Sequence, residues 1–195
     1  HQVPIDNDVS LFFQSYSKRF PDNNSVLPKT VAVTGSNGKS TTSALICHIL
    51  NSSNVNAQIG GNIGTPLFDL NPASIVKNTV MELSSYQIEV AKVLIPDIAV
   101  FLNFAPDHLD RHGGIGGYFS AKRRLFNSDR AQVSVVGVDE KEGLAITSDL
   151  RSKKKSQLIT ISTKLDLTFD DWSIFSDGIN LFEAKLGKIV TKLDI

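Results

Sequence analysis

The stretch VAVTGSNGKSTTSALICHIL, residues 31–50, decides the fold. It starts with a short β-branched run, passes through a glycine-rich turn and continues as a helical pattern from Lys39. A strand, a loop and a helix in this order form the setting that a phosphate-binding loop requires. Leu45 and Ile49 share one face of the expected helix with Thr42, so we expect much of this helix to be covered.

The turn itself reads TGSNGKST, residues 34–41, and its residue types suit a polyphosphate. The two glycines permit positive φ and close backbone approach, so that N–H groups and the helix dipole face phosphate oxygens. Lys39 supplies a cation for the terminal phosphates, and the Ser40 hydroxyl can complete a magnesium shell. The pattern G-x-x-x-x-G-K-[ST] lacks its first glycine, because Val33 stands there, so the loop is a shortened variant. The expected nucleotide-binding residues are Gly35, Ser36, Asn37, Gly38, Lys39, Ser40 and Thr41.

Further apolar runs, separated by helical patterns, predict the rest of the sheet. Buried strands are expected over 79–82 and 98–104, and two more strands over 132–138 and 157–161. A charged helix is expected over 139–155, and from Trp172 onward short strands with turn residues at 177–178 and 186–188 predict hairpins. The expected fold is α/β: a P-loop-type, doubly wound, mostly parallel sheet with helices on both faces and C-terminal β-hairpins.

The length of 195 residues suits one main domain. Residues 1–28 contain several prolines and an apolar cluster at 11–13 that can begin a helix, and we interpret them as a linker. Residues 29–195 are then the nucleotide-binding domain. The single cysteine, Cys47, excludes a disulfide framework and a cysteine-rich zinc site.

Composition excludes several classes of partner. Lys+Arg and Asp+Glu both number 20, so no net charge favours nucleic acid or an anionic membrane. No apolar run approaches the roughly 20 residues that span a bilayer, and the first ten residues lack the features of a signal peptide. We therefore expect a cytoplasmic monomer that acts on small molecules.

Polar residues at the ends of three predicted strands should meet at one edge of the sheet. Ligands of open α/β sheets bind beyond the carboxyl ends of the strands, where the phosphate loop, Glu82 and the segment Asp107-His108 are expected. A carboxylate there can hold Mg²⁺ between nucleotide phosphates. Taken alone, Glu82 would more often be an exposed strand end, and His112 a solvated loop end. His48, with no ligand spacing around it, is expected in packing or at its edge.

Four sequence blocks resemble the Mur ligases, and the resemblance covers most of residues 31–126. The segment ELSSYQ is most similar to the branch that adds D-glutamate. The blocks are TGSNGKST at 34–41, GGNIGTP at 60–66, MELSSYQIE at 81–89 and NFAPDHLDRHGGIGGYFSAKRRLF at 103–126. The resemblance implies a central ATP-binding domain of an acid–amino-acid ligase in peptidoglycan precursor synthesis. In its two-step reaction, the carboxylate of UDP-N-acetylmuramoyl-L-alanine takes the γ-phosphoryl group of ATP, and the amine of D-glutamate then displaces phosphate.

The resemblance also implies roles for individual residues. Lys39 would stabilise charge on the transferring phosphoryl group, while Ser40 and Glu82 would hold Mg²⁺. His108 is expected at a second metal. Positions near the muramoyl substrate match Asn62, Ser84 and Gln87.

Lys122 matches a lysine that Mur ligases carry as a carbamate, which is an anionic metal ligand. The modification requires a neutral amine, and at an ordinary pKa on the order of one lysine in a thousand is neutral at pH 7. The neighbouring cations Arg123 and Arg124 would favour the neutral form. Without the resemblance, a solvated helix lysine is the better interpretation.

Other hypotheses stay open. The chain could belong to another Mur-type or a folylpolyglutamate-type ligase, to a regulatory module that binds nucleotide without ligation, or to a structural domain with a vestigial loop. Glu82, His108 and Lys122 together argue against the regulatory module, and the intact loop argues against the vestigial one. Beyond residue 126 the resemblance thins, and the family's regions for the uridine diphosphate, the adenine and D-glutamate are not matched. We expect the isolated 195 residues to bind nucleotide weakly and to make no amide.

Overall fold

The structure is a computed structural model, and it describes residues 6–19, 29–70, 77–128, 132–153, 157–167, 170 and 172–194. The helices are α1 (Asp8–Arg19), α2 (Lys39–Ser52), α3 (Ser85–Val90), α4 (Leu109–His112), α5 (Ile115–Arg123) and α6 (Lys141–Lys153). Short 3-10 helices follow at Arg124–Phe126 and Leu165–Leu167. The strands are β1 (Thr30–Thr34), β2 (Ala57–Gly61), β3 (Asn78–Glu82), β4 (Ile98–Phe101), β5 (Val133–Gly137), β6 (Gln157–Ser162), β7 (Ser173–Ser176), β8 (Leu181–Lys185) and β9 (Lys188–Leu193).

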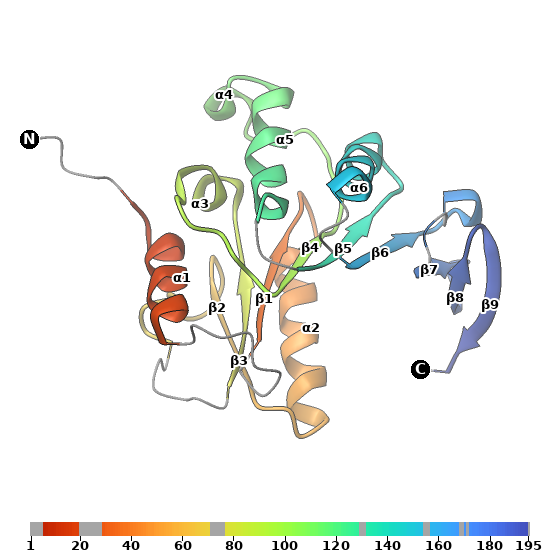
Figure 1. Ribbon diagram of the computed structural model, residues 1–195, viewed down its shortest axis with the longest axis horizontal. Helices are drawn as coiled ribbons and strands as arrows, with labels where there is room; N and C mark the ends of the chain where they lie inside the picture. Colours follow the sequence, from red (N-terminus) through yellow and green to blue (C-terminus); the bar gives the residue numbers. More distant parts are fainter. Residues whose placement is uncertain are drawn as a thin grey trace, which may run out of the picture.

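Within the described residues, the strands form one sheet in the order β2-β3-β1-β4-β5-β6-β7-β8-β9 (Figure 1). Neighbours from β2 to β7 are parallel, and β8 and β9 fold back antiparallel as the predicted hairpins. The central strand β1 is buried along its whole length between β3 and β4. The predicted doubly wound sheet is therefore confirmed, although the sequence interpretation did not identify β2 as a strand.

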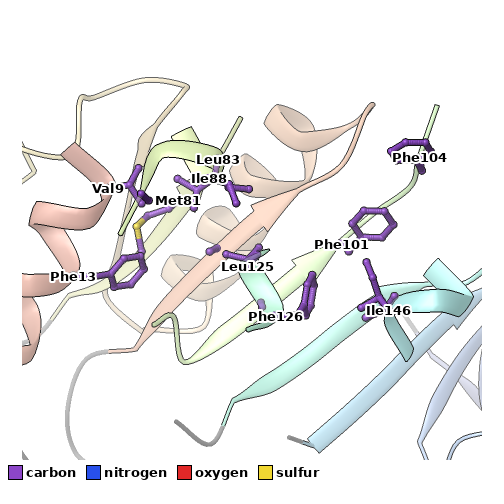
Figure 2. Close-up of a cluster of buried hydrophobic side chains, with 14 of the residues drawn as sticks. Val9, Phe13, Met81, Leu83, Ile88, Phe101, Phe104, Leu125, Phe126 and Ile146 are labelled. Atoms are coloured by element: carbon purple, nitrogen blue, oxygen red, sulfur yellow. The ribbon is translucent and has the colours of Figure 1, made fainter. Parts of the chain in front are cut away.

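Helices cover both faces of the parallel part, with α2 on one face and α3, α5 and α6 on the other (Figure 1). Alternate residues of β1 serve the two faces, as a strand requires. Val31 and Val33 belong to the apolar cluster under α2, and Ala32 belongs to the larger cluster on the opposite face. The larger cluster is filled by strand and helix residues that include Met81, Ile88, Phe101, Leu125, Phe126 and Ile146 (Figure 2).

The buried face of α2 differs from the predicted one. Leu45 is 54% exposed and Ile49 is 52% exposed, and His48 is exposed as well. The face that meets the sheet instead carries the fully buried Ser43, followed at helical spacing by Ile46, Cys47 and Leu50. Both faces of this helix carry apolar residues at helical spacing, so the pattern did not decide which one meets the sheet.

The helix α1 lies inside the segment that was interpreted as a linker. Val9 and Phe13 are fully buried in the larger cluster beside Met81 (Figure 2). Ser10 Oγ accepts a hydrogen bond from the backbone N–H of Val93 at 3.0 Å. The helix α1 therefore packs on the core through Val9 and Phe13; residues 1–5 and 20–28 of the expected linker lie outside the described residues.

The strand predicted over 98–104 is shorter than expected, because β4 ends at Phe101. Beyond it the chain turns toward the phosphate loop, and the N–H of Leu102 donates to the carbonyl of Thr34 at 3.0 Å.

A search of the described residues finds no helix with the length and apolar character that a membrane span requires.

Candidate phosphate and metal site

The phosphate loop connects β1 to α2, as its sequence context predicted. Gly38 caps α2 with a left-handed backbone, φ 77°, which favours glycine. The first helical hydrogen bond here runs from the N–H of Thr42 to the carbonyl of Gly38, at 2.9 Å. The N–H groups of the three preceding residues therefore have no partner within the helix. They form the end of the helix that attracts an anion.

Asn103 holds the other half of the loop, and its role was missed in the sequence. Its backbone carbonyl accepts from the N–H of Ser36 at 3.0 Å, and its Oδ1 accepts from the N–H of Asn37 at 2.9 Å. Its Nδ2 donates to the carbonyl of Asn37 at 3.2 Å. The early amides of the loop thus bond to Asn103, which leaves the amides at the start of α2 for a phosphate. A polar residue just beyond a strand at the same sheet edge was the available signal.

Ser36 fixes the loop from inside. Its hydroxyl donates to the carbonyl of Ala105 and accepts from the N–H of Ala105, both at 2.9 Å, and lies 3.2 Å from the hydroxyl of Tyr118. Lys39 Nζ donates to the carbonyl of Ser36 at 2.8 Å. The loop is therefore held in shape by the segment that follows β4 and by α5.

Glu82 ends β3 beside the loop and is 2% exposed. Its Oε1 accepts from Asn62 Nδ2 at 3.0 Å, while Oε2 is buried and has no hydrogen-bond partner. A buried carboxylate oxygen without a partner is unfavourable, so the position suits a cation. Among the residues described, no three His, Cys, Asp or Glu side chains converge to hold a metal by themselves. A cation at Glu82 would therefore need oxygens from a bound phosphate and from a hydroxyl such as that of Ser40.

Lys122, on α5, is 1% exposed and reaches the same loop. Its ammonium group donates to the carbonyl of Gly35 at 2.7 Å and lies 4.6 Å from the ring centre of Tyr118. Burial, together with the nearby charge of Lys39 and against an opposing effect from Asp107, lowers the pKa of Lys122 to about 7. The interpretation as a solvated lysine is therefore wrong.

The two arginines next to Lys122 do not cause this shift. Arg123 forms an ion pair with Asp149 at 3.0 Å. Arg124 donates to the backbone carbonyls of Ile88 and Ala91. Both guanidinium groups are engaged elsewhere, so the cation that depresses the pKa of Lys122 is Lys39 from the loop.

His108 lies at the start of α4 and is exposed, with a left-handed backbone of φ 51°. Its Nε2 lies 3.3 Å from Asp107 Oδ2, and its ring centre lies 5.2 Å from that of Tyr86. His112 was considered a solvated loop end, but its side chain is completely buried. The structure thus reverses the expected exposure of His112.

The residues expected near a substrate have structural partners. Besides its bond to the Glu82 side chain, Asn62 donates through its backbone N–H to the Glu82 carbonyl at 2.8 Å. Ser84 and Gln87 form the capping box of α3: Ser84 Oγ accepts from the N–H of Gln87, and Gln87 Oε1 accepts from the N–H of Ser84 at 3.1 Å. Asn62 therefore joins β2 to β3, and the serine and glutamine begin α3 at the same sheet edge.

The chain is similar in sequence to known proteins. The family profile described as Mur ligase middle domain matches residues 33–194. The chain is 47% identical over 194 residues to a protein of Cereibacter sphaeroides strain KD131 named UDP-N-acetylmuramoylalanine–D-glutamate ligase, and 46% identical to one of the same name from Ruegeria pomeroyi. Each match covers 99% of the chain and 42% of the relative. The chain thus spans less than half the length of these curated relatives.

Solved structures show the same fold. A structure of UDP-N-acetylmuramoyl-L-alanyl-D-glutamate–2,6-diaminopimelate ligase is 25% identical, with a TM-score of 0.66 over 96% of this chain and 43% of the other. FolC of E. coli, solved with ADP, is 15% identical, with a TM-score of 0.61 over all of this chain and 55% of the other. The second similarity shows the fold alone.

Proposed function

Because this chain belongs to the Mur ligase family, we propose that it is the ATP-binding part of a ligase that joins D-glutamate to UDP-N-acetylmuramoyl-L-alanine. The names of its relatives at 45–47% identity support these two substrates. Residues 29–195, together with the helix α1 that packs on them, would form the central domain, and other parts of a longer protein would bind the remaining portions of the substrates. The product would be a precursor of peptidoglycan.

The proposed reaction has two steps. A carboxylate oxygen of the muramoyl-alanine substrate bonds to the γ-phosphorus of ATP as the bond to ADP breaks, which gives an acyl phosphate. The amine nitrogen of D-glutamate then bonds to the acyl carbon, loses a proton, and expels phosphate. Lys39 and the N–H groups at the start of α2 would stabilise the charge that develops on the phosphoryl oxygens in the first step.

The observation that carries the proposal is the buried, unpartnered Oε2 of Glu82 beside the phosphate loop. It supports a role for Glu82, together with the Ser40 hydroxyl, in holding Mg²⁺ against the nucleotide phosphates. When bound, the ion neutralises phosphate charge and polarises the transferring group. Asn62 would keep the Glu82 carboxylate oriented through its bond to Oε1.

We further propose that Lys122 is carbamylated and, with His108, serves a second metal. Burial and a pKa of about 7 support this, because roughly half of the amine is then neutral at pH 7. In the reaction, the neutral Nζ bonds to the carbon of carbon dioxide and loses one proton, which leaves an anionic carbamate. The modification would replace a buried cation by an anion suited to a metal.

Asn62, Ser84 and Gln87 would lie near the muramoyl substrate, since all three are at the carboxyl edge of the sheet. We infer that the protein has no nucleic-acid or membrane partners, because acidic and basic residues balance at 20 each. We further propose that it is a cytoplasmic monomer.

The test uses the full-length protein with UDP-N-acetylmuramoyl-L-alanine, ATP and Mg²⁺, and a panel of D-glutamate, L-alanine, L-lysine and diaminopimelate. Amide product and ADP should appear with D-glutamate alone. Product with another amino acid would assign the chain to a different branch of the family. ATP binding without any amide product would instead favour a regulatory module.

A further inference from the structure

The short helix α4 depends on tertiary contacts for its orientation. It has four residues, and both flanking residues, His108 and Gly113, have left-handed backbones with φ 51° and 67°. A helix of this length is unstable by itself, so tertiary contacts must fix it and the histidine at its start. Within α4, the buried residue is His112.

His112 is joined to α3 by one hydrogen bond and by one ring face, and its second ring nitrogen, Nδ1, lies near Glu89 without a hydrogen bond. Its side chain is 0% exposed; Nε2 lies 2.9 Å from Ser85 Oγ, and Nδ1 lies 3.2 Å from Glu89 Oε2. Ser85 and Glu89 are four residues apart and therefore share one face of α3. The imidazole also stacks on Tyr86, with ring centres 5.1 Å apart and an interplanar angle of 11°. One buried ring thus joins α4 to α3.

The aromatic contacts of His112 extend to His108 through Tyr86. The ring of Tyr86 also contacts His108, with ring centres 5.2 Å apart. The guanidinium carbon of Arg111 lies 4.8 Å from the Tyr86 ring centre. The left-handed backbone of His108 costs about 1 kcal/mol, which the surrounding contacts must offset.

We propose that His112 is a positioning residue that holds His108 at the carboxyl edge of the sheet by joining α4 to α3. The imidazole has no exposed surface, so it acts through α4 and not by touching a ligand. This inference rests on the proposed metal role of His108 only for its effect on cation binding. The effect on the position of the His108 ring is independent of that role.

Three variants separate positioning from packing. His112→Phe keeps an aromatic ring against Tyr86 but removes the hydrogen bond to Ser85 and the ring nitrogen beside Glu89. Ser85→Ala removes only the link to Nε2 and disturbs packing less. His48→Phe is the matched control, because His48 is an exposed histidine on α2.

The first measurement is the NMR spectrum of the histidine rings in this 195-residue chain. We expect His112→Phe, and to a smaller extent Ser85→Ala, to shift the His108 ring resonances away from their position beside Tyr86. His48→Phe should leave them in place. Unchanged His108 resonances in both α3-link variants would overturn the proposal.

The second measurement is the affinity of the full-length protein for adenylyl imidodiphosphate by calorimetry, with and without MgCl₂. We expect His112→Phe to reduce the gain in nucleotide affinity that MgCl₂ produces about tenfold, as removal of a group that orients a metal ligand does. The affinity measured without MgCl₂ should stay unchanged. Equal loss with and without Mg²⁺ would indicate a general packing role and contradict the proposal. If the affinity of His108→Ala for the nucleotide still depends on Mg²⁺ as in the parent protein, His108 has no metal role. The NMR resonances of the His108 ring still test whether His112 positions it.

Discussion

The ammonium group of Lys122 donates a 2.7 Å hydrogen bond to the carbonyl of Gly35, so a buried cation on α5 supports the phosphate loop 87 residues earlier in the chain. The contact brings Lys122 close enough to Lys39 for the two charges to repel each other. The contact therefore couples the protonation of Lys122 to the charge of Lys39 in the loop.

This coupling predicts a pH dependence of stability. The pKa of Lys122 is lowered from 10.5 to about 7 in the folded chain. Between these values the unfolded chain binds more protons than the folded one, so folding stability should rise with pH from about 7 toward 10.5. Thermal unfolding in carbon-dioxide-free buffer should show this rise.

Lys122→Met, which keeps a long side chain without a charge, should flatten that rise. Lys153→Met, on an exposed lysine of α6, should retain it. A wild-type profile that matches that of Lys122→Met would show that Lys122 is protonated equally in both states.

Much of the fold was predictable because strand periodicity and the loop are local patterns. The strand that ends at Glu82 and the C-terminal hairpins were confirmed on that basis. The buried face of α2 was not predictable, since Leu45 and Ile49 are as apolar as Ile46 and Leu50. Only the position of the sheet decides between the two faces.

The candidate site was predictable where a residue adjoins a strand end, as with Glu82. The partner that a residue contacts was not predictable where the two residues are distant in sequence. Asn103 contacts Asn37 across 66 residues, and His112 contacts Ser85 across 27. The burial of His112 depends on how α3 packs on α4, which no pattern within DHLDRH specifies.

Glu82→Gln should separate metal binding from folding. The amide can still accept from Asn62 through its oxygen, but it removes a buried charge whose Oε2 has no partner. The stability of the metal-free protein should therefore stay equal or increase. Ligase turnover at saturating nucleotide should fall on the order of a hundredfold, because several kcal/mol of metal-dependent stabilisation is lost.

Full activity of Glu82→Gln at ordinary Mg²⁺ concentration would remove Glu82 from the proposed metal site. Asp166→Asn, at an exposed carboxylate on the 3-10 helix that follows β6, is the control for a change of charge alone. It should change neither stability nor turnover.

Asn103→Ala should loosen the phosphate loop. The change removes two side-chain hydrogen bonds to the backbone of Asn37, each worth about 1 kcal/mol. We expect nucleotide affinity, measured by calorimetry, to fall roughly tenfold or more while the fold remains intact. Asn127→Ala, at an exposed asparagine after α5, should bind nucleotide as the parent does. Equal affinities for the two variants would show that the loop keeps its shape without Asn103.

Gly61 and Gly64 offer a matched pair for the contact that positions Glu82. Both have positive φ, 105° and 67°, but a Cβ on Gly61 would lie 2.4 Å from the carbonyl oxygen of Glu82, whereas a Cβ on Gly64 would meet nothing within 4 Å. Gly64→Ala should therefore lower the free energy of unfolding by about 1 kcal/mol through backbone strain alone. Gly61→Ala should lower it further, since β2 and β3 must separate, and it should also weaken Mg²⁺-dependent nucleotide binding by displacing Glu82. Urea unfolding and calorimetry of both variants test this, and equal losses in the two would show that the close approach of β2 does not set the position of Glu82.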